Sequence, residues 1–460
     1  MLVMHRARPG AGKGSVEGFQ DEEGAPGASD RPKPEMPNVE PPLSVGLAND
    51  QVLTSTLSDV VPLGSPPAGG RECSAPLRGD GPGPAAAERQ SSDFHPDPHR
   101  HGARRGPFAS EAREVYGALD LGTNNCRLLL ARPSRRGFQV IDAFSRIIRL
   151  GEGVSQSGRL SEPAMRRTID ALRVCAQKIE RHGVRRAMLV ATEACRIASN
   201  GAEFLDRVEQ NTGLRIEILS REGEARLAVS GCASLIDPMV DYVLVFDIGG
   251  GSSELVWLDL TRIAPEARGG PLGRHVVEKA IVAWTSLSVG VVTLAETFGG
   301  RFVSEDVFEA MVAHVLELLR PFEETHGFSH RLANGTRHLL GTSGTVTTVA
   351  GVYLGLPRYD RNRVDGCWLE ADAARDVVYD LLRRSYAERV AEPCIGRDRA
   401  DLVLAGCAIL EALMRMWPSP RLRVADRGLR EGILMQLMSE DRVVGAGRRR
   451  RRRRGQGSRS

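Results

Sequence analysis

The stretch VFDIGGGSSELVW, from Val245 to Trp257, decides how the fold is interpreted. A short apolar run ends on Asp247, passes through three glycines and two serines, and resumes as a second apolar run. Such a turn leaves backbone N–H groups uncovered by side chains, and these groups can surround phosphate oxygens. The adjacent carboxylate would repel a phosphate unless a divalent cation lies between them, and Mg²⁺ prefers oxygen ligands. The turn therefore predicts a phosphate site with Mg²⁺, although Gly-rich turns are also common in purely structural hairpins.

A second copy of this pattern lies 127 residues earlier, in YGALDLGTNNCRLLLAR around Asp120. Both copies have an acid at the end of a first strand, a turn of small or polar residues, and a second strand. The repetition predicts two related halves whose acid-bearing turns face each other across a cleft.

The sequence from Tyr116 onward alternates strand-like and helix-like segments, which is typical of an α/β fold. Ser161 and Pro163 predict a helix start, and Gly183 predicts its end. We expect two domains, at residues 114–238 and 239–440. Further elements are expected as strands at 138–147, 187–192, 214–219 and near 276–286, and as helices at 200–213, 222–236 and 304–322.

The two ends of the chain differ in composition from this central part. Residues 1–113 contain more than half of the 26 prolines and predict a disordered leader. Residues 441–460 contain seven consecutive arginines, Arg448 to Arg454, and predict a disordered tail. The tail is interpreted either as a contact for a polyanion such as polyphosphate, RNA or a membrane surface, or as a solubilising segment.

The chain shows no export signal and no apolar run of 18 residues, so we expect a cytoplasmic protein without a membrane span. Its eight cysteines are scattered without a CxxC pair, so reduced thiols are expected.

Five motifs in a fixed order carry a resemblance to a known family. The two hairpins resemble the phosphate motifs of the actin-like ATPase superfamily. In order along the chain, ATEACR, LSREGEARLAVSG, DIGGGSSEL of the second hairpin, GTSGTVTTVAG and VADRGLREGIL make residues 115 to about 438 resemble the exopolyphosphatase and guanosine pentaphosphate phosphohydrolase (Ppx/GppA) family. The resemblance implies two actin-like, ribonuclease H-like α/β domains facing an interdomain cleft.

The resemblance also implies catalytic and metal-binding residues. A glutamate of the EARL segment, here Glu224, would orient or deprotonate the attacking water. Asp247 and Glu254 would face Mg²⁺, and Asp120 would support the metal through water or hold the first turn. Family members often carry another acid where this chain has Gly223, which would reduce activity if that acid assists the base.

Three of these acids also have structural interpretations. Glu224 would complement a helix dipole, Asp247 would cap its turn, and Glu254 would be a solvated acid on the outer face of a strand.

The expected phosphate-binding groups are backbone N–H groups of the two turns and arginine side chains, which suit bidentate recognition of phosphate. They are Thr123, Asn124, Arg127, Arg196, Gly250, Gly251, Ser252 and Arg430. Alternatives are a structural ion pair for Arg127 and a surface pair of Arg430 with Glu431. The segment Leu339–Thr348 predicts a helix N-terminus that binds an anion or nucleotide, or an ordinary capped helix.

The function that the resemblance implies is Mg²⁺-dependent release of the terminal phosphate from polyphosphate or guanosine pentaphosphate. One alternative is an actin-like kinase or ATPase, and another is a non-catalytic sensor of guanosine tetraphosphate or polyphosphate. The sequence does not choose between the two substrates. Dimers are common in the family, so a homodimer is one assembly open to this chain.

Overall fold

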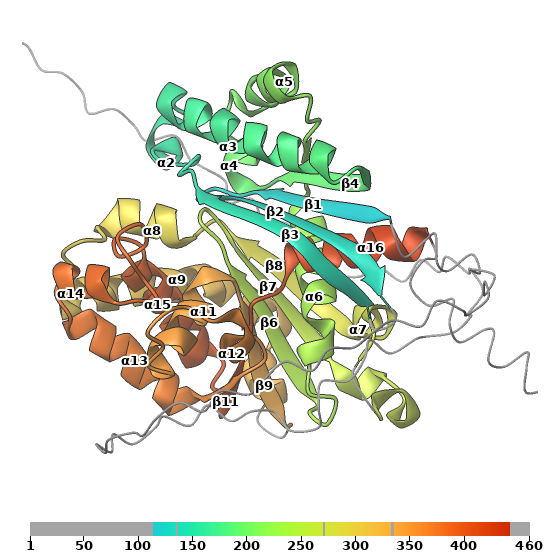
Figure 1. Ribbon diagram of the computed structural model, residues 1–460. Helices are drawn as coiled ribbons and strands as arrows, with labels where there is room; N and C mark the ends of the chain where they lie inside the picture. Colours follow the sequence, from blue (N-terminus) through green and yellow to red (C-terminus); the bar gives the residue numbers. More distant parts are fainter. Residues whose placement is uncertain (1–113, 135–136, 270–271, 333–334, 442–460) are drawn as a thin grey trace, which may run out of the picture. The chain divides into compact units, whose positions relative to one another are not determined.

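The computed structural model describes residues 114–134, 137–269, 272–332 and 335–441 (Figure 1). The expected leader at 1–113 lies outside these residues, as does the expected tail at 441–460 apart from Asp441. Within the described ranges no disulfide joins the cysteines. No helix in these ranges is both long and apolar enough to cross a membrane.

The first sheet contains the first predicted hairpin. Its strands are β1 (Val115–Leu121), β2 (Asn125–Ser134), β3 (Gly137–Ile147), β4 (Val184–Ala191) and β5 (Glu217–Ile218), in the order β3-β2-β1-β4-β5. β1 pairs antiparallel with β2 and parallel with β4. The hairpin prediction is confirmed, whereas the strand expected at 214–219 is only two residues long.

The second sheet contains the second hairpin. Its strands are β6 (Tyr242–Ile248), β7 (Ser253–Asp259), β8 (Ile281–Leu287), β9 (Arg337–Thr342), β10 (Trp368–Glu370) and β11 (Arg421–Ala425), in the order β10-β11-β9-β6-β7-β8. The strand expected from about Val276 begins only at Ile281, because α7 (Arg274–Ala280) precedes it. Val277 and Ala280 are buried at helical spacing, and Arg274 pairs with Glu278 one turn later at 2.8 Å.

The two sheets repeat one strand order. The series β3-β2-β1-β4-β5 in the first sheet has the same arrangement as β8-β7-β6-β9-β11 in the second. In both sheets, neighbours among the first three strands of the series pair antiparallel. The third of them, β1 or β6, pairs in parallel with the next strand, β4 or β9. This repeat confirms the expected actin-like α/β fold.

The helices around the first sheet begin at recognisable signals. They are α2 (Val154–Ser157), α3 (Glu162–Arg181), α4 (Glu193–Ile197) and α5 (Gly201–Thr212). The Ser161 side chain caps α3 by accepting a hydrogen bond from the Ala164 N–H at 3.4 Å, as the sequence predicted. α3 packs on β2, and Leu172, Phe204 and Leu128 belong to one buried cluster (Figure 1).

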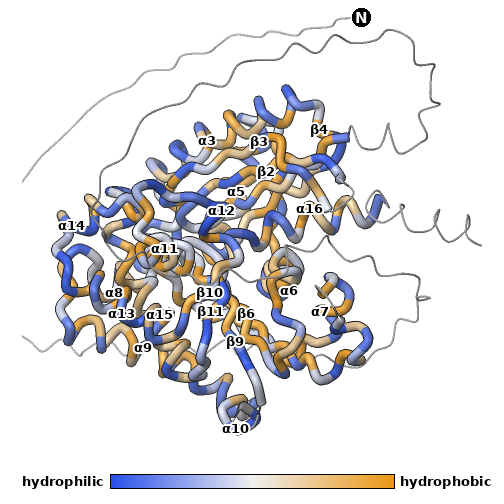
Figure 2. Tube along the Cα trace, turned by 60° about the horizontal axis from the view of Figure 1, so that its bottom comes forward, coloured by the Kyte–Doolittle hydropathy of each residue, from blue (hydrophilic) through white to orange (hydrophobic). Residues whose placement is uncertain are grey.

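The helices around the second sheet cover both of its faces. In addition to α7 they are α8 (Val291–Phe298), α9 (Glu305–His326), α10 (Phe328–Leu332), α11 (Ser343–Tyr353), α12 (Arg361–Val364), α13 (Ala371–Arg383), α14 (Tyr386–Ala391) and α15 (Val403–Met416). Three short 3₁₀ helices span Ala233–Leu235, Leu260–Arg262 and Pro265–Arg268. α15 is buried over Val403–Met414, in keeping with its hydrophobic colour in Figure 2.

Two helices are exchanged between the sheets. α6 (Arg221–Cys232) follows the first sheet in the chain, yet Ala225 and Val229 belong to a core cluster of the second. α16 (Leu429–Glu440) follows the second sheet, yet its apolar residues pack against β1 and β2 of the first (Figure 1). The two helices approach closely, since a Cβ on Gly432 would lie 2.1 Å from the Leu227 carbonyl oxygen. This crossing fixes the two sheets against each other behind the two hairpin turns.

Candidate active site

The two acid-bearing turns lie in direct contact. A Cβ on Gly250 would lie 2.9 Å from Thr123 Cβ and 3.1 Å from the Asn124 backbone nitrogen. A Cβ on Gly251 would lie 2.8 Å from Thr123 Oγ1. Only glycine permits this approach, so the turn predicted to bind phosphate needs its glycines for contact with the other turn.

The first turn is held by its carbonyl groups. The Gly122 N–H donates to the Asn125 carbonyl at 2.9 Å. The Asn124 carbonyl accepts hydrogen bonds from the N–H groups of Ile148 and Arg149, and the Thr123 carbonyl accepts one from Gly151. The backbone hydrogen bonds of the described residues include none from the N–H groups of Thr123 and Asn124. These two donors therefore stay available for a ligand.

The second turn is built in the same way. The Gly249 N–H donates to the Ser252 carbonyl at 2.9 Å, and Val291 and Val292 donate to the carbonyls of Gly249 and Gly250 at 3.0 and 2.8 Å. The start of α8 approaches so closely that a Cβ on Gly290 would lie 2.5 Å from the Gly250 carbonyl carbon. The predicted donors Gly250, Gly251 and Ser252 make no backbone N–H hydrogen bond in the described part of the chain.

Four predicted carboxylates are destabilised by their surroundings. Burial raises the pKa of Asp247 to about 6, and burial together with the charge of Asp247 raises the pKa of Glu254 to about 7. Burial also raises the pKa of Asp120 and of Glu224, and the charge of Glu254 adds to the effect on Glu224. Several acids that repel one another in a buried place indicate a site that a cation would stabilise.

Glu254 is not the solvated outer-face acid of the alternative interpretation. It is 3% exposed, and its Oε1 accepts hydrogen bonds from the hydroxyls of Ser252 at 2.8 Å and Ser286 at 2.9 Å. It lies directly across the hairpin from Asp247, to which the Ser343 side chain is hydrogen bonded. The strand register therefore brings the two expected metal ligands side by side.

Two predicted arginines, Arg127 and Arg430, make no ion pair or side-chain hydrogen bond among the described residues, although both lie close enough to Asp120 to act on it electrostatically. Arg127 lies across the first hairpin from Asp120, and the charges of Arg127 and Arg430 both lower the pKa of Asp120 against the effect of burial. Burial lowers the pKa of Arg430, so its charge is held there at a cost. An anion between the two arginines would offset that cost.

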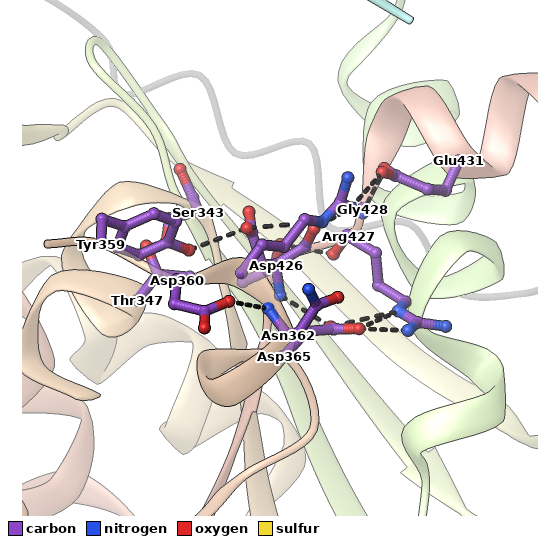
Figure 3. Close-up of polar contacts among 12 residues, drawn as sticks. Ser343, Thr347, Tyr359, Asp360, Asn362, Asp365, Asp426, Arg427, Gly428 and Glu431 are labelled. Atoms are coloured by element: carbon purple, nitrogen blue, oxygen red, sulfur yellow. Dashed lines mark hydrogen bonds and ion pairs between the residues drawn. The ribbon is translucent and has the colours of Figure 1, made fainter. Parts of the chain in front are cut away.

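The surface pair of Arg430 with Glu431 is not formed. Glu431 is 5% exposed, and it accepts hydrogen bonds from Arg361 at 2.8 Å and from the Gly428 N–H at 2.9 Å (Figure 3). Arg361 thereby holds the start of α16, the helix that carries Arg430.

The segment before α16 is held by a second group of polar contacts, seen in Figure 3. The Tyr359 hydroxyl donates to Asp426 Oδ2 at 2.8 Å, and the Asp426 N–H donates to Asp365 Oδ1 at 3.0 Å. Arg427 Nε donates to both oxygens of Asp365. These contacts fix the VADRGLREG motif at the end of β11.

Arg196 was predicted to face the phosphate, and in the structure it contacts the predicted base. Its Nη2 donates to Glu224 Oε2 at 2.7 Å and to the Leu219 carbonyl at 2.7 Å, and its Nη1 donates to Glu193. Burial alone would lower the pKa of Arg196, but the two carboxylates raise it. Glu224 itself follows the Ser220 cap of α6, whose side chain accepts from the Gly223 N–H at 3.1 Å.

A small cavity of about 70 Å³ opens beside the two turns. Its lining includes Arg127, Asn125, Arg399 and the start of α11, from Ser343 to Thr345. Ser343 has a φ of 80°, a strained conformation for a residue with a side chain, and such strain gathers at functional sites. The anion-binding helix start expected within Leu339–Thr348 therefore lies at the site. Sequence reasoning missed Arg399, whose only signal is a cluster of charged residues ahead of the apolar α15.

The donor set fits Mg²⁺ in part. Asp247 and Glu254 supply hard oxygen ligands, but the described ranges contain no group of three or more His, Cys, Asp and Glu side chains that could hold a metal alone. Mg²⁺ commonly takes one or two carboxylates and completes its shell with water and substrate phosphate. The residues present fit that mode of binding.

The fold and site together define a class of enzyme. Two sheets of the same strand order bring two turns with free N–H groups beside Arg127, Arg430 and buried acids, an arrangement that suits a phosphate group. The chain belongs to the Ppx/GppA phosphatase family, because residues 129–441, well over half of its length, match that family.

Solved structures agree with this assignment. A Ppx/GppA family member from Aquifex aeolicus is 28% identical, with a TM-score of 0.57 over 71% of this chain and 98% of that one. An exopolyphosphatase-like protein is 29% identical, with a TM-score of 0.61 over 70% of this chain and 97% of that one. An exopolyphosphatase from Cytophaga hutchinsonii is 22% identical, with a TM-score of 0.61 over 72% and 100%, and supports the fold alone.

Proposed function

We propose that this phosphatase is a Mg²⁺-dependent phosphoanhydride hydrolase that releases the terminal phosphate of inorganic polyphosphate or guanosine pentaphosphate. The observation that carries the proposal is that Arg127 and Arg430, which make no ion pair or side-chain hydrogen bond among the described residues, lie beside Asp120 and the two open turns. In phosphoryl transfer the negative charge spreads over the oxygens of the transferred group, so fixed donors and cations supply most of the catalysis.

Backbone and arginine donors would bind the terminal phosphate. The N–H groups of Thr123 and Asn124 would contact it from the first turn, and those of Gly250, Gly251 and Ser252 from the second. Arg127 and Arg430 would offset its charge, and Arg196 would join them when it leaves Glu224. Arg399, on the cavity wall, would contact the next phosphate of the chain.

Asp247 and Glu254 would hold Mg²⁺, and Asp120 would support it through water. When bound, the ion offsets the negative charge that develops on the leaving phosphate. The raised pKa values of Asp247 and Glu254 support this assignment, because a cation would restore their ionised forms.

Glu224 would act as the base. Its pKa is raised well above the usual range by burial and by the charge of Glu254, which favours taking a proton from water. The water oxygen attacks the terminal phosphorus, its proton passes to Glu224, and the bond to the bridging oxygen breaks. The products are inorganic phosphate and a chain shortened by one unit.

The name of the exopolyphosphatase-like relative favours polyphosphate, whereas the family description, Ppx/GppA phosphatase, names no substrate. The site suits either of the two proposed substrates, because each presents a terminal phosphate on an anhydride. The two other functions considered from the sequence, an actin-like kinase and a non-catalytic sensor, are distinguished by the outcomes of the test.

The test is Mg²⁺-dependent phosphate release from long polyphosphate, tripolyphosphate, guanosine pentaphosphate and ATP. Wild type should release phosphate from at least one of the first three, and Glu224→Ala should lose about 10²-fold or more in kcat, the usual contribution of a general base. Glu222→Ala is the matched control, because Glu222 lies exposed on the same helical turn and pairs with Arg226. Binding without release would favour the sensor, and release from ATP that requires an acceptor would favour the kinase.

A further inference from the structure

Glu193 is a buried acid with no role in the proposed mechanism so far. It is the first residue of α4, directly after β4, and is 2% exposed. A buried carboxylate is costly unless cations and hydrogen bonds compensate it. Glu193 has two such partners: its Oε1 accepts from Arg221 Nη2 at 2.7 Å, and its Oε2 accepts from Arg196 Nη1.

These contacts form a chain of alternating charges that ends at the base. Arg221 contacts Glu193, Glu193 contacts Arg196, and Arg196 contacts Glu224 at 2.7 Å. The exposed fractions of the last three side chains are 3%, 15% and 13%, so solvent screens these pairs weakly. A change at Glu193 should therefore be felt at Glu224.

Arg196 is held on separate sides. Glu193 binds its Nη1, the Leu219 carbonyl accepts from both Nε and Nη2, and Glu224 binds Nη2. If the hydrogen bond between Arg196 Nη2 and Glu224 breaks, Glu193 and the Leu219 carbonyl still fix the plane of the guanidinium. The Nη2 donor can then pass from Glu224 to a phosphate oxygen without a rotation of the side chain.

Glu193 also touches the second turn. A Cβ on Gly251 would lie 3.3 Å from the Cγ of Glu193 and 2.8 Å from Thr123 Oγ1. The stem of Glu193 thus packs beside the place where the two phosphate turns meet, and its carboxylate faces the arginine that holds the base.

We propose that Glu193 is a positioning residue: it anchors Arg196 so that an arriving phosphate takes the donor that Glu224 occupied, which frees the Glu224 carboxylate for the attacking water. This proposal rests on the proposed function. It assigns no proton transfer to Glu193, which acts only through Arg196.

The test is a double-mutant cycle between Glu193→Gln and Arg196→Lys, with tripolyphosphate as substrate. Glu193→Gln keeps the shape of the side chain and removes its charge, and we expect about a tenfold loss of kcat, because a misplaced donor weakens positioning. The KM should stay within about twofold, since Arg127 and Arg430 remain to bind the phosphate. In the Arg196→Lys background, Glu193→Gln should change kcat by less than about twofold.

Arg226→Gln is the matched control. It breaks the exposed pair with Glu222 on the same helix, and none of the ion pairs of the described residues joins Arg226 to Glu193 or Arg196, so kcat should stay within about twofold of wild type. Additive losses in the double variant, or an equal loss from Arg226→Gln, would overturn the proposal in favour of a structural ion pair. If Glu193→Gln does not unfold cooperatively, Glu193→Asp replaces it in the cycle.

A second readout separates this proposal from the proposed function. The same cycle is measured in the Kd for tripolyphosphate by calorimetry without divalent cations. If wild type binds tripolyphosphate here but, with Mg²⁺ present, releases phosphate from none of the substrates of the first test, the hydrolase proposal fails. In that case the positioning role is judged from Kd alone. Coupled effects of Glu193→Gln and Arg196→Lys on Kd would support it, and additive effects would overturn it.

Discussion

The two hairpins share one geometry and differ at one decisive position. In the first, Asp120 lies across the strands from Arg127, and in the second, Asp247 lies across from Glu254, in the same register. The first hairpin therefore presents an acid with a cation, and the second presents two acids. The same backbone thus carries side chains of opposite charge in the first hairpin and of like charge in the second, and in the proposed function only the second would also hold a cation.

The supports of the two turns are also comparable. The segment after β3 donates backbone hydrogen bonds to the first turn, and the segment after β8 donates them to the second, with β3 and β8 at equivalent places in their sheets. The two turns differ in which atoms their supporting glycines approach. Gly151 approaches a side chain of its turn, whereas Gly290 approaches the backbone of its turn.

The largest effect is expected from Arg127→Glu, which gives the first hairpin the acid pair of the second. It removes the cation that we propose binds phosphate and adds repulsion, so kcat/KM for phosphate release should fall about 10³-fold or more. Steady-state phosphate release measures the effect. Arg132→Glu is the control on the same strand, because Arg132 is exposed, and it should retain activity. Comparable losses in both variants would mean that overall charge, and not the hairpin position, controls activity.

The next largest effect is expected from Glu254→Gln, which weakens the cation-binding character of the second hairpin. The Mg²⁺ concentration for half-maximal activity should rise about tenfold or more, and saturating Mg²⁺ should restore part of kcat. A Mg²⁺ titration of phosphate release measures both. Glu266→Gln, at an exposed acid later in the same half of the chain, should leave the requirement unchanged. An unchanged Mg²⁺ requirement in Glu254→Gln would remove Glu254 from the metal site.

The hairpins were predictable because their signal is local. Strand, acid, small-residue turn and strand follow one another within about 15 residues, and the pattern occurs twice. The α3 helix was equally local, through its Ser161 cap and Pro163. The place of Glu224 near the turns, by contrast, came from the family resemblance, because the chain alone does not show that α6 crosses to the other sheet.

The features that sequence reasoning missed depend on contacts between distant segments. Arg399 reaches the cavity only because the segment before α15 folds back over the turns. The acid in ATEACR gave no sign of joining Arg196 to Arg221, since Arg221 lies 28 residues away. The start of β8 was misjudged because the apolar spacing of α7 runs directly into the apolar strand.

A smaller effect, on stability, is expected from the two supporting glycines. Gly290→Ala would place a Cβ 2.5 Å from backbone atoms of Gly250, which cannot move without disturbing the second turn. We expect a loss of about 3 kcal/mol in the free energy of unfolding. Gly151→Ala would meet the Thr123 side chain at 2.3 Å, which can rotate, so about 1 kcal/mol is expected. Urea unfolding of both variants measures the difference, and equal losses would show that the two turns are equally adaptable.

The last comparison concerns a pair of equivalent positions on the central parallel strands. Tyr116 and Val243 each lie four residues before the acid of their hairpin, and their parallel partners are Arg186 and His338. His338 is 2% exposed, and its Nε2 accepts a hydrogen bond from the Asp237 N–H at 3.2 Å. Burial lowers the pKa of His338 to about 4. Protonation would place two hydrogens between Nε2 and the Asp237 nitrogen, so the folded protein disfavours it.

Because the pKa of His338 is lower in the folded than in the unfolded chain, the unfolded chain binds the extra proton first as the pH falls. The stabilisation is therefore complete above about pH 6.5 and is lost progressively down to about pH 4. Between pH 7 and 5 the stability advantage of wild type over His338→Gln should shrink by about 2 kcal/mol. Arg186→Gln alters the equivalent position of the first sheet without removing a group that titrates in this range, so its difference from wild type should stay constant. A constant difference for His338→Gln as well would show that the histidine is protonated without cost, and that the two parallel strands respond alike to pH.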